Sequence, residues 1–161
     1  MTKICLKRFL ILFLVVLLFG CSPELPNGGL LLPDNFNAVI MIDSVEERVR
    51  HMAVSDDGVL YGKLRNSHDK AGIIALKDND GDGRADEIEK FGAYRSEQKW
   101  SYATAMRIYN GYMYFSSELV VYRYKLKPGS LLPDGEMEVV VTDDHEHGKH
   151  EHIGKPIAFD N

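Results

Sequence analysis

The sequence repeats one pattern of short apolar stretches, and this repeat restricts the possible fold more than any other feature. Residues 51–56 and residues 105–110 both alternate apolar with other side chains and then reach Asp or Asn. A glycine and a second apolar stretch follow in each case, and the two glycines, Gly58 and Gly111, stand 53 positions apart. Alternation with a period of two is typical of half-buried strands. The sequence therefore predicts repeated β-hairpins.

Each predicted hairpin continues into two more strands. The third strands cover residues 72–76 and 119–124, and the fourth strands cover residues 87–91 and 136–141. Four short strands in a unit of about 40 to 50 residues are typical of a β-propeller blade. We therefore predict an all-β fold, a β-propeller with about two four-stranded blades. A β-sandwich with two similar hairpins is the alternative.

A third copy of the hairpin pattern begins at residues 156–161, where the sequence holds only its first strand. A closed propeller needs at least about four blades, so two blades and one strand would leave an unpaired sheet edge. We expect the chain to be an incomplete ring, either a fragment of a longer product or a truncated reading frame. Such a chain is predicted to be marginally stable alone and prone to associate.

The connection between the third and fourth strands of the first unit has the spacing of a calcium loop. Residues 78–89 place carboxylates at loop positions 1, 3, 5 and 9 and Gly83 at position 6, where a sharp turn is needed. The flanks are too short for the helices of an EF-hand, so we predict a β-hairpin tied by calcium, with a solvated acidic turn as the alternative. The expected ligands are Asp78, Asp80, Asp82, the Arg84 carbonyl, Asp86 and, optionally, Glu89.

The start of the chain has the pattern of an export signal. Three basic residues precede an apolar run at residues 9–19, which is too short to span a bilayer of about 30 Å. Residues 18–21, Leu-Phe-Gly-Cys, resemble the lipobox of bacterial lipoproteins. We therefore predict a signal peptide at residues 1–20, a lipid anchor at Cys21 and a flexible tether at residues 21–31. A plain secretory signal or an uncleaved anchor is the alternative.

Charge restricts the partners of the exported chain. Removing residues 1–20 takes away three basic residues, so 19 basic against 24 acidic residues becomes 16 against 24, and the net charge moves from −5 to about −8. An acidic surface disfavours nucleic acids and anionic lipid headgroups, so we expect membrane attachment through the acyl chains at Cys21. Ser22 resembles the residue that follows the cysteine in outer-membrane lipoproteins. The predicted location is the cell envelope, facing the periplasm or the cell surface if there are two membranes.

A histidine-rich stretch lies near the end of the sequence, at His145, His147, His150 and His152. Alternate imidazoles on an extended chain could bind a transition metal, and a solvated polar loop is the alternative. His152 differs from the others because it precedes a predicted strand at residues 153–161 that would hold it in place. A fixed histidine could act as a general base because its pKa lies near neutrality, although it could also be structural.

In order and content, these motifs resemble the soluble quinoprotein glucose and sorbosone dehydrogenases, which are six-bladed β-propellers that use pyrroloquinoline quinone (PQQ). The resemblance covers residues 32–161, predicted as a partial propeller. It implies that His152 takes the proton of a substrate hydroxyl while hydride passes to the quinone. The matching segments are residues 32–36, 51–61, 74–86, 120–124 and 152–160.

The resemblance implies a PQQ-dependent oxidoreductase that acts on a sugar CH–OH group or an aldehyde. The sequence lacks the later blades, which in this family supply most contacts to the quinone and its calcium ion. The calcium predicted at residues 78–89 resembles a peripheral hairpin ion instead. We therefore expect the chain to be inactive alone. The alternatives are a non-catalytic calcium-stabilised surface propeller that binds a glycan or protein partner, and a metal scavenger that uses the histidines.

Overall fold

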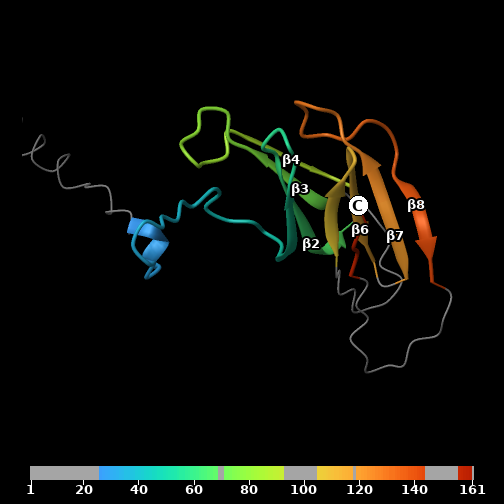
Figure 1. The fold of residues 1–161 in the computed structure, drawn as a ribbon, viewed down its shortest axis with the longest axis horizontal. Coiled ribbons are helices and arrows are strands. Elements are labelled where there is room, and N and C mark those ends of the chain that lie inside the picture. Colours follow the sequence, from blue (N-terminus) through green and yellow to red (C-terminus); the bar gives the residue numbers. More distant parts are fainter. Residues whose placement is uncertain (1–25, 69–70, 93–104, 118, 144–155, 161) are drawn as a thin grey trace, which may run out of the picture. The chain divides into compact units, whose positions relative to one another are not determined.

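A computed structural model describes residues 26–68, 71–92, 105–117, 119–143 and 156–160 (Figure 1). The chain divides into two compact units, Met1–Val39 and Ile40–Asn161. In the described part of the first unit, a short 3-10 helix, η1 (Pro26–Gly29), is followed by irregular chain, and the Ala38 backbone N–H donates to Asn27 Oδ1 at 3.1 Å.

The second unit contains two four-stranded antiparallel sheets, and in each sheet the strands lie side by side in sequence order. The prediction of an all-β fold with two four-stranded units is therefore confirmed. Green ribbons mark most of the first sheet and yellow to orange ribbons mark the second in Figure 1. The first sheet comprises β1 (Val49–Val54), β2 (Leu60–His68), β3 (Ala71–Lys77) and β4 (Glu87–Phe91). The second sheet comprises β5 (Met106–Tyr109), β6 (Tyr112–Ser116), β7 (Val120–Lys125) and β8 (Glu138–Thr142).

The strand predicted at residues 153–161 is not formed in its described part, residues 156–160. A strand needs a neighbour with which to exchange backbone hydrogen bonds, and no strand of either sheet pairs with this segment. The segment instead lies against the second sheet, where the Phe159 ring stacks on Tyr109 with centroids 4.4 Å apart. Residues 156–160 therefore lie beside the second sheet, where the third unit was predicted to begin, but they do not form a strand.

The two hairpins differ in their turns. Asn110 and Gly111 link β5 to β6 with φ angles of 47° and 76°, the left-handed pair that a two-residue type I′ turn requires. The β1–β2 connection is longer, because Val54 pairs with Leu60 across five intervening residues. Both hairpins were expected from their glycines, whereas the extra length of the first was not.

The main core lies between the two sheets. The residues that the first sheet contributes are small or medium in size apart from Tyr61, while the second sheet contributes two methionines and three aromatic rings. The buried members are Val59, Tyr61, Ile73, Ala75, Met106, Met113, Phe115, Val120, Tyr122, Tyr124 and Leu131. A smaller cluster of Leu64, Ile74 and Leu76 lies on the opposite face of the first sheet, where Met41, Ile42 and Val45 cover it.

The two sheets meet through unlike faces. In the first sheet Tyr61 pairs with Ala53 and Ala75, and in the second sheet Tyr114 pairs with Arg107 and Arg123 at the corresponding ladder positions. Tyr61 belongs to the core between the sheets. Tyr114, by contrast, lies on the outer face of the second sheet, where it contacts the Phe159 ring at 4.7 Å. The sheets are therefore stacked head to tail.

Candidate metal centre

Residues 78–86 form the connection between β3 and β4, whose ladder closes at the Lys77–Glu87 pair. The connection turns back sharply at Gly81 and Gly83, which have φ angles of 82° and 89°. Glycine adopts this left-handed conformation without the steric cost of a Cβ atom. The two short strands and the glycines between them explain why the sequence forms a hairpin loop here and not a helix-loop-helix.

Three aspartates converge inside this loop. Asp78, Asp80 and Asp86 each offer a carboxylate oxygen, and these three oxygens lie within 4.8 Å of one another. Carboxylate oxygens are the ligands that a hard cation such as Ca²⁺ prefers. The ligand chemistry therefore fits calcium, and three of the predicted side chains meet where the sequence places them.

Backbone hydrogen bonds prepare Asp78 for an ionised role. Its two carboxylate oxygens accept from the backbone N–H groups of Gly81 at 2.7 Å and Gly83 at 2.8 Å. These bonds hold the pKa of Asp78 below its usual value of 3.8 because they favour the charged form. The Asp86 carboxylate is also bound to the backbone, since its Oδ2 accepts from the N–H of Asn79 at 2.7 Å.

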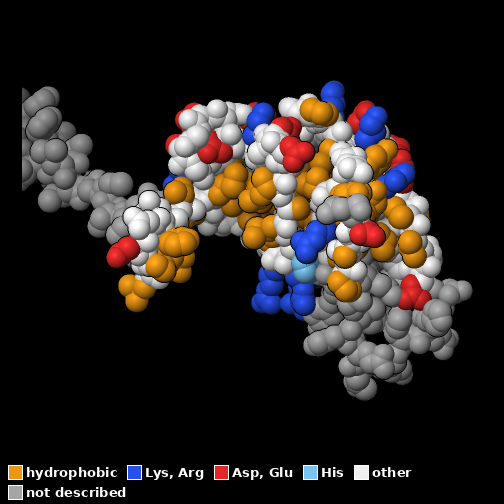
Figure 2. All heavy atoms as spheres, viewed as in Figure 1, with side chains coloured by type: hydrophobic (Ala, Val, Ile, Leu, Met, Phe, Trp, Pro, Cys, Tyr) orange, Lys and Arg blue, Asp and Glu red, His pale blue; other side chains and the backbone are white. Residues whose placement is uncertain are grey.

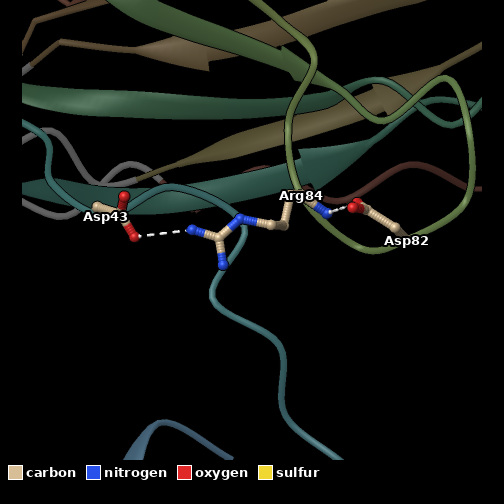
Figure 3. Close-up of polar contacts among 3 residues, drawn as sticks. All are labelled: Asp43, Asp82 and Arg84. Atoms are coloured by element: carbon tan, nitrogen blue, oxygen red, sulfur yellow. Dashed lines mark hydrogen bonds and ion pairs between the residues drawn. The ribbon is translucent and has the colours of Figure 1, made fainter. Parts of the chain in front are cut away.

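Two of the other predicted ligands, Asp82 and Glu89, do not belong to this cluster of carboxylates. The Asp82 carboxylate accepts from the Arg84 backbone N–H at 2.7 Å, as drawn in Figure 3. Glu89 lies within β4 opposite Ala75, two positions beyond the start of the strand. The Arg84 carbonyl remains a predicted ligand. The structure thus unites Asp78, Asp80 and Asp86 and leaves Asp82 and Glu89 outside the group.

The loop also holds a second segment that sequence reasoning missed. Arg84 Nη2 contacts Asp43 Oδ1 at 3.0 Å, and Figure 3 shows the guanidinium reaching toward that carboxylate. The Ala85 backbone N–H donates to the Met41 carbonyl at 2.9 Å. Asp43 is 81% exposed, so the ion pair itself adds little stability. Arg84 and Asp43 lie 41 positions apart in the sequence, and no sequence pattern links them, so the contact could not be predicted.

A cleft of about 350 Å³ opens between the turns of the two hairpins, and no residue of the acidic loop lines it. One of its walls is fixed by Asp57, whose Oδ2 accepts from the Gly129 backbone N–H at 2.6 Å and whose Oδ1 accepts from Ser55 Oγ. The hydrogen bond from Ser55 and then that from Gly129 lower the pKa of Asp57. The residues that line the cleft are Ser55, Asp56, Asp57, Tyr61, Ile108, Tyr109, Asn110, Gly111, Leu126, Lys127 and Pro128.

One lysine is buried inside the core. The Lys63 side chain is fully shielded from solvent, donates from Nζ to the Ser116 carbonyl and lies 5.7 Å from the centre of the Phe115 ring. Burial lowers the pKa of Lys63 from 10.5 to about 7. The sequence contains a weak indication of this burial, because Lys63 continues the alternation of β2 that places Tyr61 in the core.

Several predicted sites lie outside the described residues. These are the lipidation site Cys21 and the histidines His145, His147, His150 and His152. In the described part of the chain, no helix has the length and hydrophobicity that crossing a membrane requires. The predicted signal, anchor and general base therefore remain predictions.

Three comparisons with known proteins were made, and no family model, curated protein or solved structure matches the chain.

Proposed function

We propose that this chain is a calcium-stabilised module of propeller type, exported and held at a membrane by a lipid on Cys21. Its sequence motifs resemble those of the PQQ-dependent glucose and sorbosone dehydrogenases, and we propose that it is related to them. The observation that carries the proposal is the convergence of Asp78, Asp80 and Asp86 within 4.8 Å in a hairpin loop. Calcium in this loop would hold β3 and β4 together and would not take part in a reaction.

The packing of the sheets supports the propeller over a sandwich. Successive propeller blades are related by rotation, so the same face of each blade meets the opposite face of the next. Here Tyr61 of the first sheet and Phe115 of the second belong to the same core, while Tyr114, the counterpart of Tyr61, faces Phe159. A sandwich of two duplicated sheets would more simply bring like faces together.

Binding of calcium is tested by the thermal unfolding of the purified full chain, first stripped with a chelator and then titrated with calcium. A ligand that binds only the folded state stabilises it by about 2.7 kcal/mol at 100 times its Kd, so we expect a rise in Tm of several degrees. Asp78→Asn removes the charge and keeps one of the two oxygens that accept the Gly81 and Gly83 hydrogen bonds, and it should abolish the rise.

Glu89→Gln is the matched control, because it removes a carboxylate from the same hairpin but outside the cluster. This variant should keep the full response to calcium. Magnesium should give a smaller rise, since it demands a stricter octahedral geometry than calcium does. An Asp78→Asn variant that responds to calcium as the parent chain does would refute the site.

The quinone has no assigned contact among the described residues, so we derive no reaction step through it. When bound in the dehydrogenases that this chain resembles, the quinone accepts hydride. The contribution proposed for this chain is His152, as the acceptor of a substrate hydroxyl proton. Its substrate would be a sugar or an aldehyde.

A further inference from the structure

The cleft between the two hairpin turns has no part in the proposed function, and the fold ties its walls to one another. These walls come mainly from the β1–β2 turn, the β5–β6 turn and the chain that follows β7. The Gly129 backbone N–H donates to Asp57 at 2.6 Å, which ties the third wall to the first. The Leu126 backbone N–H donates to the Gly111 carbonyl at 2.8 Å, which ties the third wall to the second. A cleft held in this way costs a ligand less ordering entropy than a loose one.

Mostly apolar side chains form the buried part of the lining. Tyr61 is 1% exposed and belongs to the main core, and Ile108 and Leu126 pack against that core. The Tyr61 hydroxyl already has a partner, since it donates to the Ser130 carbonyl at 3.4 Å. An apolar group that enters the cleft is therefore favoured by about 25 cal/mol for each Å² of apolar surface that leaves water.

Two exposed side chains of opposite charge also line the cleft, Asp56 and Lys127. Within the part of the chain that the structure describes, neither side chain forms an ion pair or a hydrogen bond, with the other or with a third residue. Asp57 differs, because both of its carboxylate oxygens accept hydrogen bonds. The cleft therefore presents one carboxylate and one ammonium group to a ligand.

Charges of both signs lie at this end of the sheets. The β1–β2 turn and the β7–β8 connection are at the same end in Figure 1, and Figure 2 shows acidic and basic side chains interspersed over it. In the cleft, an anion would be repelled by Asp56 and a cation by Lys127. A neutral ligand would make use of neither charge. The charges thus favour a ligand that carries one of each sign.

We propose that the cleft binds an apolar amino acid in its zwitterionic form. The ammonium group of the ligand faces Asp56, its carboxylate faces Lys127, and its apolar side chain lies on Tyr61, Ile108 and Leu126. The cleft volume of about 350 Å³ lies within the range of about 300–1,000 Å³ that small-molecule sites occupy. This inference goes beyond the proposed function, because it concerns binding alone and needs neither calcium nor quinone.

The proposal is tested by titrating the purified full chain, in a detergent that covers the predicted lipid anchor, with three probes followed by NMR. The probes are L-leucine, 3-methylbutylamine, which lacks the carboxylate of leucine, and 4-methylpentanoate, which lacks its ammonium group. Exposed charge pairs contribute up to about 1 kcal/mol, so each charge is worth about two- to fivefold in Kd. Leucine should bind the parent chain more tightly than either of the other probes.

Two variants of the cleft separate the two charges. Asp56→Asn should weaken the binding of leucine and of the amine by about two- to fivefold and should not weaken that of the acid. Lys127→Gln should weaken the binding of leucine and of the acid by a similar factor and should not weaken that of the amine. Both side chains are exposed, so neither substitution disturbs the core, and circular dichroism verifies the fold.

Lys125→Gln with Asp134→Asn is the matched control, because it removes an exposed ion pair of 3.2 Å that does not line the cleft. This variant should bind all three probes as the parent chain does, which also accounts for any probe taken up by the detergent. No binding of leucine at about 10 mM would overturn the proposal, as would leucine binding that both cleft variants leave unchanged. Equal weakening of all three probes in each cleft variant would overturn it too. The response to calcium, measured on the same samples, reports separately on the proposed metal site.

Discussion

At the scale of single residues, Lys63 is the most informative side chain because its burial conflicts with its charge. The pKa of Lys63 falls to about 7 in the folded chain against 10.5 in water. The unfolded chain therefore binds more protons between about pH 7 and pH 10.5, so the free energy of unfolding should rise with pH across this window. Below pH 7 both states are protonated and the full cost of burying the ammonium group applies.

Lys63→Met should remove this pH dependence. Methionine has a similar length, fills the same space beside Phe115 and carries no charge, although the Ser116 carbonyl loses a donor. We expect the variant to be about equally stable at pH 10.5 and more stable than the parent chain by about 3–5 kcal/mol at pH 7, since a pKa that falls from 10.5 to about 7 costs about 1.4 kcal/mol for each pH unit between them. Urea unfolding at both pH values measures the difference. A variant that is destabilised equally at both would show that Lys63 stabilises the core in its neutral form.

At the scale of elements, the tie between the first hairpin turn and the β7–β8 connection rests on one carboxylate. Asp57→Ala breaks the 2.6 Å bond from the Gly129 backbone N–H and the bond from Ser55. Its cost should be about 1–2 kcal/mol of unfolding free energy. Because the pKa of Asp57 is lowered on folding, its contribution should persist above about pH 4 and fade as the pH drops through the folded pKa.

Asp56→Ala is the control for this prediction, since it removes the neighbouring carboxylate of the same turn. Equilibrium urea unfolding of both variants at pH 7 and pH 3 separates the two aspartates. Equal losses in the two variants would mean that the acidity of the turn matters and that the specific bond to Gly129 does not.

The strands were the features that the sequence predicted best. Alternation of side chains and the turn glycines located all eight strands, and the predicted range of β4, residues 87–91, coincides with the observed one. The pattern failed at residues 156–160, because alternation shows that a segment can be a strand but not that a partner strand lies beside it.

The site was predictable only in part, for the same kind of reason. Loop spacing brought Asp78, Asp80 and Asp86 together because their distances along the chain set their distances in space. The contacts of Arg84 with Asp43 and of Lys63 with Ser116 depend on tertiary packing, which spacing does not report. Asp82 lies outside this group, and its carboxylate accepts from the Arg84 backbone N–H.

At the scale of the whole molecule, the proposed ancestry predicts that the chain alone is not a working dehydrogenase. We expect no oxidation of glucose or of an aldehyde when the full chain is supplied with PQQ, calcium and an artificial electron acceptor. Turnover that disappears in His152→Ala would contradict this expectation, because it would mean that these residues suffice for an active site. Absorbance of the reduced acceptor dye measures the rate, and the parent chain without PQQ is the blank.

The unlike-face stacking of the two sheets has a consequence for how such a molecule changes over generations. An internal duplication of one unit adds a surface that already fits the surface before it, so no new contact has to arise by mutation. Loss of a unit likewise exposes surfaces that still fit each other. Proteins assembled on this principle can therefore gain or lose sheets while keeping the contacts between the sheets that remain.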